Sequence, residues 1–152
     1  MKIEIITPKK IYFSQIIKLL QVISDFYPNK KSEEIIWESF INQKDVYSFV
    51  ALDNDADNFD RQLVGFGSLH LSRKVRGGVI GFIEDIAVLE NYRSKGIGKL
   101  ILKKLITKAK EESCYKLVLE CREENSAFYQ KIGFKKSGFS MSLILWKILG
   151  IK

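Results

Sequence analysis

The stretch NYRSKGIGK, residues 91–99, decides the fold of this chain. It follows an apolar run typical of a strand (79–88) and precedes a stretch (97–112) whose apolar residues share one face of a helix. Gly96 and Gly98 let a ligand approach the backbone closely, because no side chain blocks it. The free N–H groups and the dipole of a helix start favour an anion such as pyrophosphate. The segment therefore predicts a strand–turn–helix unit that binds a phosphate group.

The spacing of the glycines excludes two other phosphate-binding motifs. Counted from Gly96, a dinucleotide-binding GxGxxG would need Gly or Ala where this chain has Ile101. The Walker pattern GxxxxGK[ST] is absent from the sequence. Three basic residues add positive charge around the turn instead: Arg93, Lys95 and Lys99.

The patterns on either side of this unit predict further strands and helices. Strands are expected at 3–6, 46–52, 63–71 and 116–121, with one or two more within 135–148. Helices are expected at 14–26, from Ser32 onward and at 125–132. A meander of antiparallel strands thus leads into a β-α-β unit. We predict an α/β fold with a mixed, mostly antiparallel central sheet flanked by helices, as a single domain over residues 1–152.

Composition and charge narrow the class of protein. The chain has 152 residues, of which 46% are hydrophobic and 28% charged, as expected for a soluble globular domain. No apolar run reaches the roughly 18 residues of a membrane span, and the N-terminus does not read as a signal peptide, so we expect a cytoplasmic protein. Cys114 and Cys121 have the spacing of neither a redox pair nor a zinc site, and no metal is expected.

The net charge of +7 raises the question of a nucleic-acid partner. Nucleic-acid-binding surfaces interleave aromatic residues with Lys and Arg on one exposed face. In this chain the aromatic residues fall mostly in apolar runs, so we expect no nucleic-acid partner.

The run Arg93-Ser94-Lys95-Gly96-Ile97-Gly98 matches the [RQ]xxGx[GA] acetyl-CoA signature, and here the chain resembles the GNAT superfamily of N-acetyltransferases. Within that superfamily it looks like the glucosamine 6-phosphate N-acetyltransferases. The segments that carry this resemblance are GFIEDIAV (81–88), YRSKGIGKLIL (92–102), CYKLVLEC (114–121) and EENSAFYQKIGF (123–134). The resemblance is strong from about Gly81 to Met141. The first 70 residues match mainly in the order of elements.

The resemblance implies that the fourth and fifth strands part and hold the pantetheine arm of acetyl-CoA between them. Backbone groups of Ile86, Ala87 and Val88 would contact the arm, and Asn125 and Tyr129 would lie near the arm and the thioester. The pyrophosphate would be held by the turn residues Arg93, Ser94, Lys95, Gly96, Ile97, Gly98 and Lys99. No metal is implied.

The resemblance also implies the reaction. Acetyl would pass directly, in a ternary complex, to the amine of D-glucosamine 6-phosphate, giving N-acetylglucosamine 6-phosphate for UDP-GlcNAc biosynthesis. Glu120 would act as general base, Tyr129 would stabilise or protonate the thiolate, and an N–H near Ile86 would polarise the carbonyl. The acceptor residues implied are Ser14, Glu84, Asp85 and Glu120. Arg73, Arg76 and Arg122 have no clean match in the family and are further candidates for acceptor contacts. Adjacent strand residues point to opposite faces, so the Glu84–Asp85 pair could share a pocket only at a bulge.

One departure from the family concerns the acceptor phosphate. Family members carry an arginine shortly after the methionine of the last strand, and Ile144 stands in that register here. Without a charged partner the phosphate would lose a substantial part of its binding energy. Arg73, Lys74, Arg76 or Arg122 could supply the contact instead. The apolar C-terminal tail, by the same resemblance, predicts a homodimer with exchanged C-terminal strands.

Three alternatives remain open from the sequence. The chain could acetylate another small amine or a protein N-terminus, since these enzymes share the cofactor signature. It could be a basic nucleic-acid-binding module, although the placement of its aromatic residues argues against this. It could be an acyl-CoA sensor without activity, although it carries both Glu120 and Tyr129. His70 is given no role.

Overall fold

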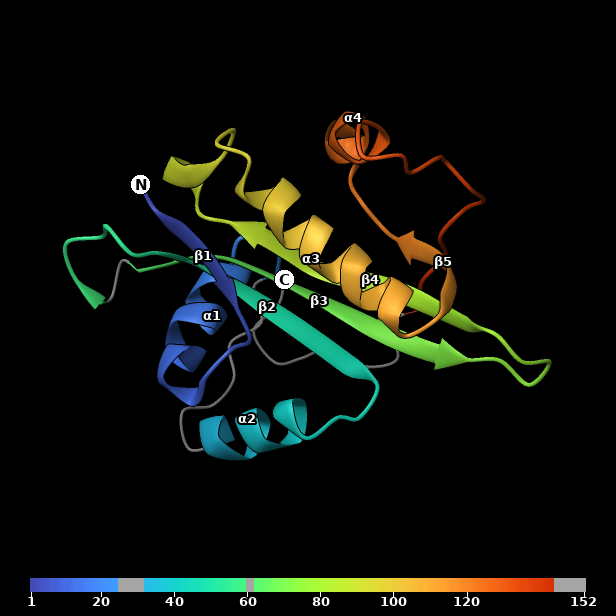
Figure 1. The fold of residues 1–152 in the computed structure, drawn as a ribbon, viewed down its shortest axis with the longest axis horizontal. Coiled ribbons are helices and arrows are strands. Elements are labelled where there is room, and N and C mark those ends of the chain that lie inside the picture. The colour runs from blue at the N-terminus through green and yellow to red at the C-terminus, as the bar shows by residue number, and fades with distance from the viewer. Residues whose placement is uncertain (25–31, 60–61, 144–152) are drawn as a thin grey trace.

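The computed structural model describes residues 1–24, 32–59 and 62–143 (Figure 1). The main elements in chain order are β1 (Ile3–Ile6), α1 (Phe13–Leu20), α2 (Glu33–Ile41), β2 (Val46–Asp53), β3 (Leu63–Arg73), β4 (Val79–Val88), α3 (Ile97–Glu111), β5 (Cys114–Leu119) and α4 (Ser126–Gln130). Short 3-10 helices lie at η1 (Lys10–Tyr12), η4 (Glu90–Tyr92) and η5 (Glu123–Asn125), before α1, α3 and α4. No helix in the described ranges combines the length and the apolar character needed to cross a bilayer.

The five strands form one sheet in the order β1-β2-β3-β4-β5. Neighbours from β1 to β4 run antiparallel, and β5 runs parallel to β4 across the connection made by α3. Helix α3 covers one face of the sheet, and α1 and α2 lie on the other (Figure 1). The predicted mixed, mostly antiparallel sheet flanked by helices is confirmed.

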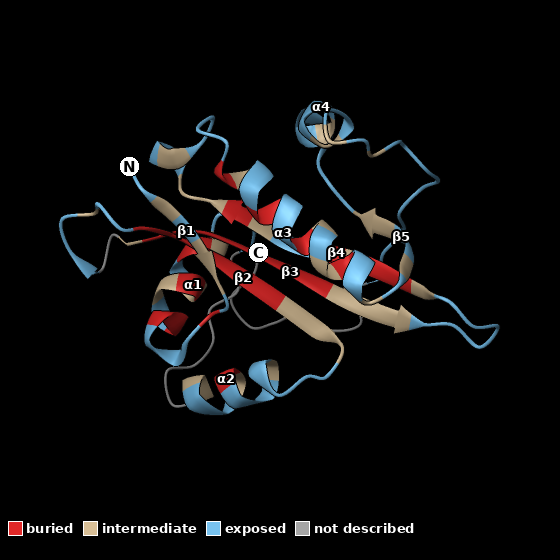
Figure 2. Ribbon diagram, in the orientation of Figure 1, coloured by how far each residue is buried: buried red, intermediate tan, exposed pale blue. Residues whose placement is uncertain are grey.

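Helix α3 packs directly on β3 because two glycines there remove the side chains from between them. An ideal Cβ at Gly67 would lie 2.8 Å from Ile101 Cγ2, and one at Gly65 would lie 2.8 Å from Ile101 Cδ1. The buried stripe of α3 sits in this groove and forms the larger core, which Figure 2 shows as a red band along the helix and strands. The stripe consists of Ile97, Ile101, Leu102, Leu105 and Ala109.

Two predicted elements differ in extent from the structure. The helix expected at 14–26 ends at Leu20, where N–H groups of Val22 and Ile23 bond three residues back and tighten the chain into turns; its last two residues lie outside the described ranges. The strand expected at 116–121 runs from Cys114 to Leu119 instead, because its parallel pairing with β4 begins at Cys114.

The C-terminal strands expected within 135–148 are not found in the described part, which ends at residue 143. Gly138 has a positive φ of 74°, which turns the chain, and no described residue here pairs with β5. Phe139, Met141 and Leu143 are almost fully exposed. The position of Ile144, and the rest of the predicted strand-exchange segment, lies outside the described residues.

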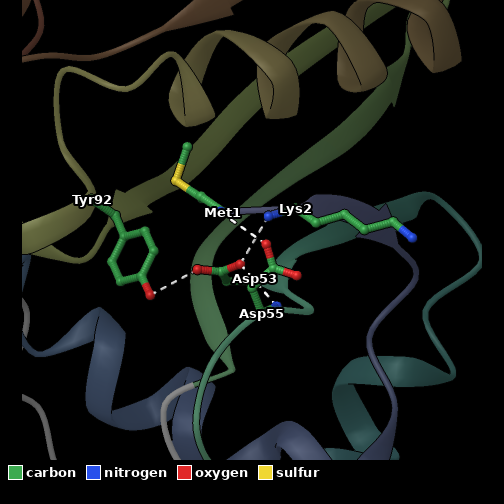
Figure 3. Close-up of polar contacts among 5 residues, drawn as sticks. All are labelled: Met1, Lys2, Asp53, Asp55 and Tyr92. Atoms are coloured by element: carbon green, nitrogen blue, oxygen red, sulfur yellow. Dashed lines mark hydrogen bonds and ion pairs between the residues drawn. The ribbon is translucent and has the colours of Figure 1, made fainter.

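A hydrogen-bonded aspartate ties β2 to the turn before α3 (Figure 3). Asp53 is 6% exposed; its Oδ2 accepts a hydrogen bond from the Tyr92 hydroxyl at 3.0 Å, and its Oδ1 accepts from the N–H groups of Lys2 at 3.1 Å and Asp55 at 3.2 Å. Burial alone would raise the pKa of Asp53, but these hydrogen bonds to the charged form outweigh it and the pKa is lowered. The ionised carboxylate therefore holds Tyr92 immediately before the glycine turn.

Tyr92→Phe should lower the thermal unfolding midpoint by a few degrees near neutral pH, because Asp53 loses a donor while the ring stays in place. Because the pKa of Asp53 is lower in the folded state than in the unfolded state, where it is about 3.9, the ionised carboxylate stabilises the fold above that pH. This stabilisation is lost as the pH falls through the pKa of the folded state. The difference from wild type should therefore shrink below about pH 4. Circular dichroism melts from pH 7 to pH 3 measure it, with the exposed Tyr115→Phe as control. Equal unfolding midpoints for Tyr92→Phe and wild type at pH 7 would show that the hydrogen bond between Tyr92 and Asp53 does not stabilise the fold.

Candidate active site

The sheet opens between β4 and β5. The two strands pair in parallel from Val79 opposite Cys114 to Ile83 opposite Leu119, where β5 ends. Strand β4 continues to Val88 while remaining paired with β3. Among the described residues nothing pairs with the outer edge of β4 from 84 to 88. The predicted parting of the two strands is confirmed.

The backbone on this open edge alternates in direction. The N–H of Leu89 donates to Val64 O at 2.9 Å, so Leu89 faces β3. In an antiparallel ladder the next residues alternate, which turns the peptide groups of Val88 and Ile86 outward and those of Ala87 toward β3. Ile86 and Val88 are therefore better placed than Ala87 to offer backbone hydrogen bonds to a ligand in the gap.

A β-bulge shapes the middle of β4. The register with β3 shifts by one residue, so that Asp85 and Ile86 together oppose Gly67. Asp85 has a positive φ of 56°, which is uncommon for a residue other than glycine. The bulge interrupts the alternation that would otherwise send Glu84 and Asp85 to opposite faces, and both side chains are exposed.

The two carboxylates act on each other. The pKa of Asp85 is raised, chiefly by loss of solvation and then by the neighbouring charge of Glu84, while His70 opposes the shift. A positive group placed between the carboxylates would relieve this repulsion. The charge at the bulge therefore suits a cationic group.

The turn from Tyr92 to α3 has the geometry of an anion cradle. Ser94 and Gly96 both have positive φ, 61° and 80°, and the helix begins at Ile97 without a side-chain cap. An ideal Cβ at Gly96 would meet no atom within 4 Å, so the space before the helix start is open. The first-turn N–H groups, which have no partner inside the helix, face this space. These residues fit a pyrophosphate.

The basic residues of the turn lie exposed around it. Arg93 Nε donates to the outward-facing carbonyl of Val88 at 3.4 Å. Lys95 Nζ lies 5.0 Å from the centroid of the Tyr92 ring, and Lys99 is exposed in the first turn of α3. All three are free to add charge to a bound phosphate without loss of a buried ion pair.

Tyr129 lies in α4, close to the start of α3. An ideal Cβ at Gly98 would lie 3.2 Å from Phe128 Cζ, so α4 rests against the helix start. The half-buried Tyr129 ring makes edge contacts with Phe128 and Phe134, at centroid distances of 5.0 and 6.0 Å. Burial raises the pKa of Tyr129, and nearby Cys121 adds to the shift. Like any tyrosine with an ordinary or raised pKa, Tyr129 carries its proton at neutral pH.

Two further predicted residues follow β5. Glu120 is the first residue after the strand; it is exposed and accepts a hydrogen bond from the Ser140 hydroxyl. Asn125 precedes α4 as its N-cap residue, but its side chain makes no capping bond. With Tyr129, these residues belong to the segment that leaves β5 where the sheet opens.

The predicted basic acceptor residues differ in their surroundings. Arg73 pairs with Asp45 at 3.1 Å, and Arg122 lies 3.9 Å from Glu124, a loose contact between exposed groups. Arg76 is exposed in the hairpin between β3 and β4. We call Glu84 together with the adjoining bulge residues Asp85 and Ile86 the acidic bulge. None of these contacts brings an arginine to it.

Lys74 is better placed. Its Nζ lies 5.8 Å from the centroid of the Phe82 ring and donates to Ser72 Oγ at 2.8 Å. Phe82 and Glu84 are two residues apart on β4, which puts them on the same face of the sheet. The Lys74 ammonium therefore lies over the face that carries Glu84, beside the Phe82 ring.

The predicted residue Ser14 lies elsewhere, in an open depression between α1 and α2 that Lys10 and Glu34 also line. No hydrogen bond within the described residues joins it to the acidic bulge or to Glu120. Ser68, which the sequence reasoning passed over, donates to the backbone oxygen of Glu84 beside the bulge, and His70, which was given no role, contacts Ser68. The signal for them was the alternation of Ser68, His70 and Ser72 on one face of an otherwise apolar strand.

Parted strands beside an amide-lined helix start define an acyl-coenzyme A-dependent N-acyltransferase fold. The chain belongs to the acetyltransferase (GNAT) family, whose sequence profile matches residues 16–134. A crystal structure of an acetyltransferase from Trypanosoma brucei superposes with a TM-score of 0.84 at 25% identity, covering 95% of this chain and 100% of the other. Acetyl-CoA is the acyl donor that this family uses.

Curated relatives are similar over part of the chain. Glucosamine 6-phosphate N-acetyltransferase 1 of Dictyostelium discoideum is 40% identical over 86 residues, which is 55% of each protein. Glucosamine 6-phosphate N-acetyltransferase of Schizosaccharomyces pombe is 35% identical over 101 residues, covering 65% of this chain and 91% of the relative. The match thus spans little more than half the length of the Dictyostelium relative.

Gly96→Trp should abolish acetyl-CoA binding, because its side chain would fill the open space before the helix start. Isothermal titration calorimetry with acetyl-CoA measures the loss. Gly96→Ala is the control for backbone strain: it adds a Cβ at positive φ but little bulk, and should weaken binding far less. Undiminished binding by Gly96→Trp would mean that the pyrophosphate lies elsewhere.

Proposed function

We propose that this chain is an acetyl-CoA-dependent N-acetyltransferase that acetylates the amine of D-glucosamine 6-phosphate. The product would be N-acetylglucosamine 6-phosphate, a precursor in UDP-GlcNAc biosynthesis. The observation that carries the proposal is the similarity, at 35–40% identity, to relatives described as glucosamine 6-phosphate N-acetyltransferases. The acidic bulge of β4, with Lys74 on the same face, supports it, because this acceptor carries both an ammonium and a phosphate.

The open edge of β4 and the turn before α3 would hold the donor. Acetyl-CoA supplies the acetyl group as an activated thioester. Ile86 and Val88 would offer outward backbone groups to its arm, and the N–H groups from Ser94 to Lys99 would bind the pyrophosphate. The positive charges of the turn and the position of Asn125 beside α4 support the same placement. Ala87 would contribute contact surface rather than hydrogen bonds.

The chain's own residues would manage two protons. Glu120, exposed to solvent, would take a proton from the acceptor ammonium directly or through water, leaving a neutral amine that attacks the thioester carbonyl. The N–H of Ile86 would donate a hydrogen bond to the carbonyl oxygen as negative charge develops on it. Tyr129 would give its proton to the departing thiolate and recover, through solvent, the second proton that the attacking nitrogen loses as the amide forms. The position of the half-buried hydroxyl in α4, beside the start of α3, supports this role.

The acceptor would lie along the face of β4 that carries Glu84. Glu84 and Asp85 would bind the ammonium and ring hydroxyls. Phe82 lies two residues away, about 7 Å along the strand. Lys74, over the Phe82 ring, would bind the phosphate in place of the family's C-terminal arginine. Of the other basic residues, Arg73 would first have to leave Asp45.

Two features of the proposal concern the assembly and its setting. A homodimer through exchanged C-terminal strands would complete the outer edge of β5, which is unpaired among the described residues. The reaction would take place in the cytoplasm, where acetyl-CoA and sugar phosphates are both available. A single domain over residues 1–152 would suffice for it.

Release of free coenzyme A from acetyl-CoA should be seen with glucosamine 6-phosphate and be much weaker with glucosamine. Lys74→Gln should raise KM for the phosphate ester several-fold and leave KM for glucosamine unchanged, because only the phosphate contact is lost. Lys103→Gln, an exposed lysine on α3, is the matched charge control. Activity with neither sugar, in a protein that binds acetyl-CoA, would refute this acceptor and leave another amine as substrate.

Tyr129→Phe should lower kcat about 10- to 1000-fold with little change in the dissociation constant of acetyl-CoA, because the hydroxyl is lost and the ring packing is kept. Stopped-flow or steady-state thiol detection gives kcat, and calorimetry gives the binding constant. Phe134→Leu perturbs the same aromatic cluster without touching the hydroxyl. If Tyr129→Phe turns over at the wild-type rate, the hydroxyl has no part in the chemistry.

A further inference from the structure

A chain of hydrogen bonds runs from His70 through Ser68 to the acidic bulge. Ser68 is fully buried, and its Oγ lies 3.1 Å from His70 Nε2 and 3.2 Å from the backbone oxygen of Glu84. The carbonyl can only accept, so the single hydroxyl hydrogen of Ser68 goes to Glu84. His70 Nε2 must then carry a hydrogen and donate it to Ser68 Oγ. We call this series the His70–Ser68 relay.

The relay acts on the backbone where β4 departs from regular geometry. Glu84 directly precedes Asp85, whose positive φ of 56° is held only if the surroundings restrain it. Ser68 lies opposite Glu84 in the sheet, next to the bulge. Because the Ser68 hydroxyl is fully buried, water cannot replace its hydrogen bond to the Glu84 carbonyl, and breaking this bond costs free energy. The relay therefore fixes the peptide that enters the bulge.

His70 is also within electrostatic reach of Asp85. Its charge lowers the pKa of Asp85, against the effects of burial and of Glu84. The half-buried imidazole lies on the same face of β3 as Ser68, two residues along the strand. His70 thus contacts Ser68, which holds the backbone of Glu84, and it lowers the pKa of the Asp85 carboxyl next to it.

We propose that His70 is a positioning residue of the acceptor site: through Ser68 it holds the Glu84 carbonyl, and so sets how the bulge presents Glu84 and Asp85 to an acceptor amine. The effect on catalysis rests on the proposed acetyl transfer. The direction of the hydrogen bonds does not. The two parts can therefore be tested separately.

The direction of the hydrogen bonds in the relay can be measured without an enzyme assay. The chain has one histidine, so a long-range ¹H–¹⁵N spectrum of the imidazole reports on His70 alone. At pH 8 we expect the neutral ring to carry its proton on Nε2, and Ser68→Ala to release this preference. A neutral ring protonated on Nδ1 in the wild-type protein would overturn the relay, whatever the protein catalyses.

The kinetic part compares His70→Leu with His70→Gln, whose side-chain N–H can replace the Nε2 donor. His70→Leu should raise KM for the acceptor about 5- to 10-fold, the size of one hydrogen bond, with kcat and acetyl-CoA binding changed less than about twofold. His70→Gln should recover most of the loss. Equal impairment of the two variants, or an equal loss of acetyl-CoA affinity in His70→Leu, would overturn the positioning role.

A double-mutant cycle adds a second check. If the relay acts as a unit, Ser68→Ala combined with His70→Leu should be no worse in acceptor KM than the poorer single variant. Additive losses would overturn it. Wild-type protein that releases no coenzyme A with any amine would instead refute the proposed reaction. The Kd of each variant for glucosamine 6-phosphate, measured by calorimetry, would then replace KM in the same comparisons, with the same expected ratios.

Discussion

The structure depends on how β4 pairs with its two neighbours. It pairs with β3 along its whole length and with β5 along only its first half. Backbone N–H and C=O groups need hydrogen-bond partners, and a strand edge that has none inside the protein remains open to an extended ligand. From Glu84 to Val88 this edge faces the gap beside β5. The bulge belongs to the same constraint, since it lies where β4 ceases to be a central strand.

Helix α3, beside the gap, is fixed by its packing on the sheet and by contacts at its N-terminal end. Gly65 and Gly67 allow α3 to lie directly on β3, which sets its height above the sheet. Asp53 holds Tyr92 just before the helix start, and Phe128 of α4 lies against Gly98 in its first turn. An anion site made of backbone N–H groups requires such rigidity, because its donors bind well only if they already point the right way.

The sequence predicted the part of this arrangement that local patterns encode. The glycine turn, the strand before it and the periodic helix after it each follow from short-range rules, and all three were found. The bulge was left open, because two adjacent carboxylates read the same way in a regular strand and in a bulged one. The positive φ of Asp85 depends on its pairing with β3, which is remote in sequence. The early end of α1 and the shifted start of β5 were likewise set by tertiary contacts.

The same division explains why the donor site is easier to recognise than the acceptor site. The donor is expected to meet mostly backbone groups, so glycine spacing and strand order are enough to define its place. The acceptor is expected to contact the side chains of Glu84 and Asp85 on β4. Substitutions of these exposed side chains need not disturb the fold. Lys74, pointing over Phe82, occupies the face where an acceptor phosphate needs a cation, although it does not stand in the register of the family's arginine. His70 and Ser68 hold the backbone of the same region from a neighbouring strand. On the proposed assignment, selectivity for the acceptor depends on a few side chains of β3 and β4, whereas the ability to use acetyl-CoA depends on the fold itself.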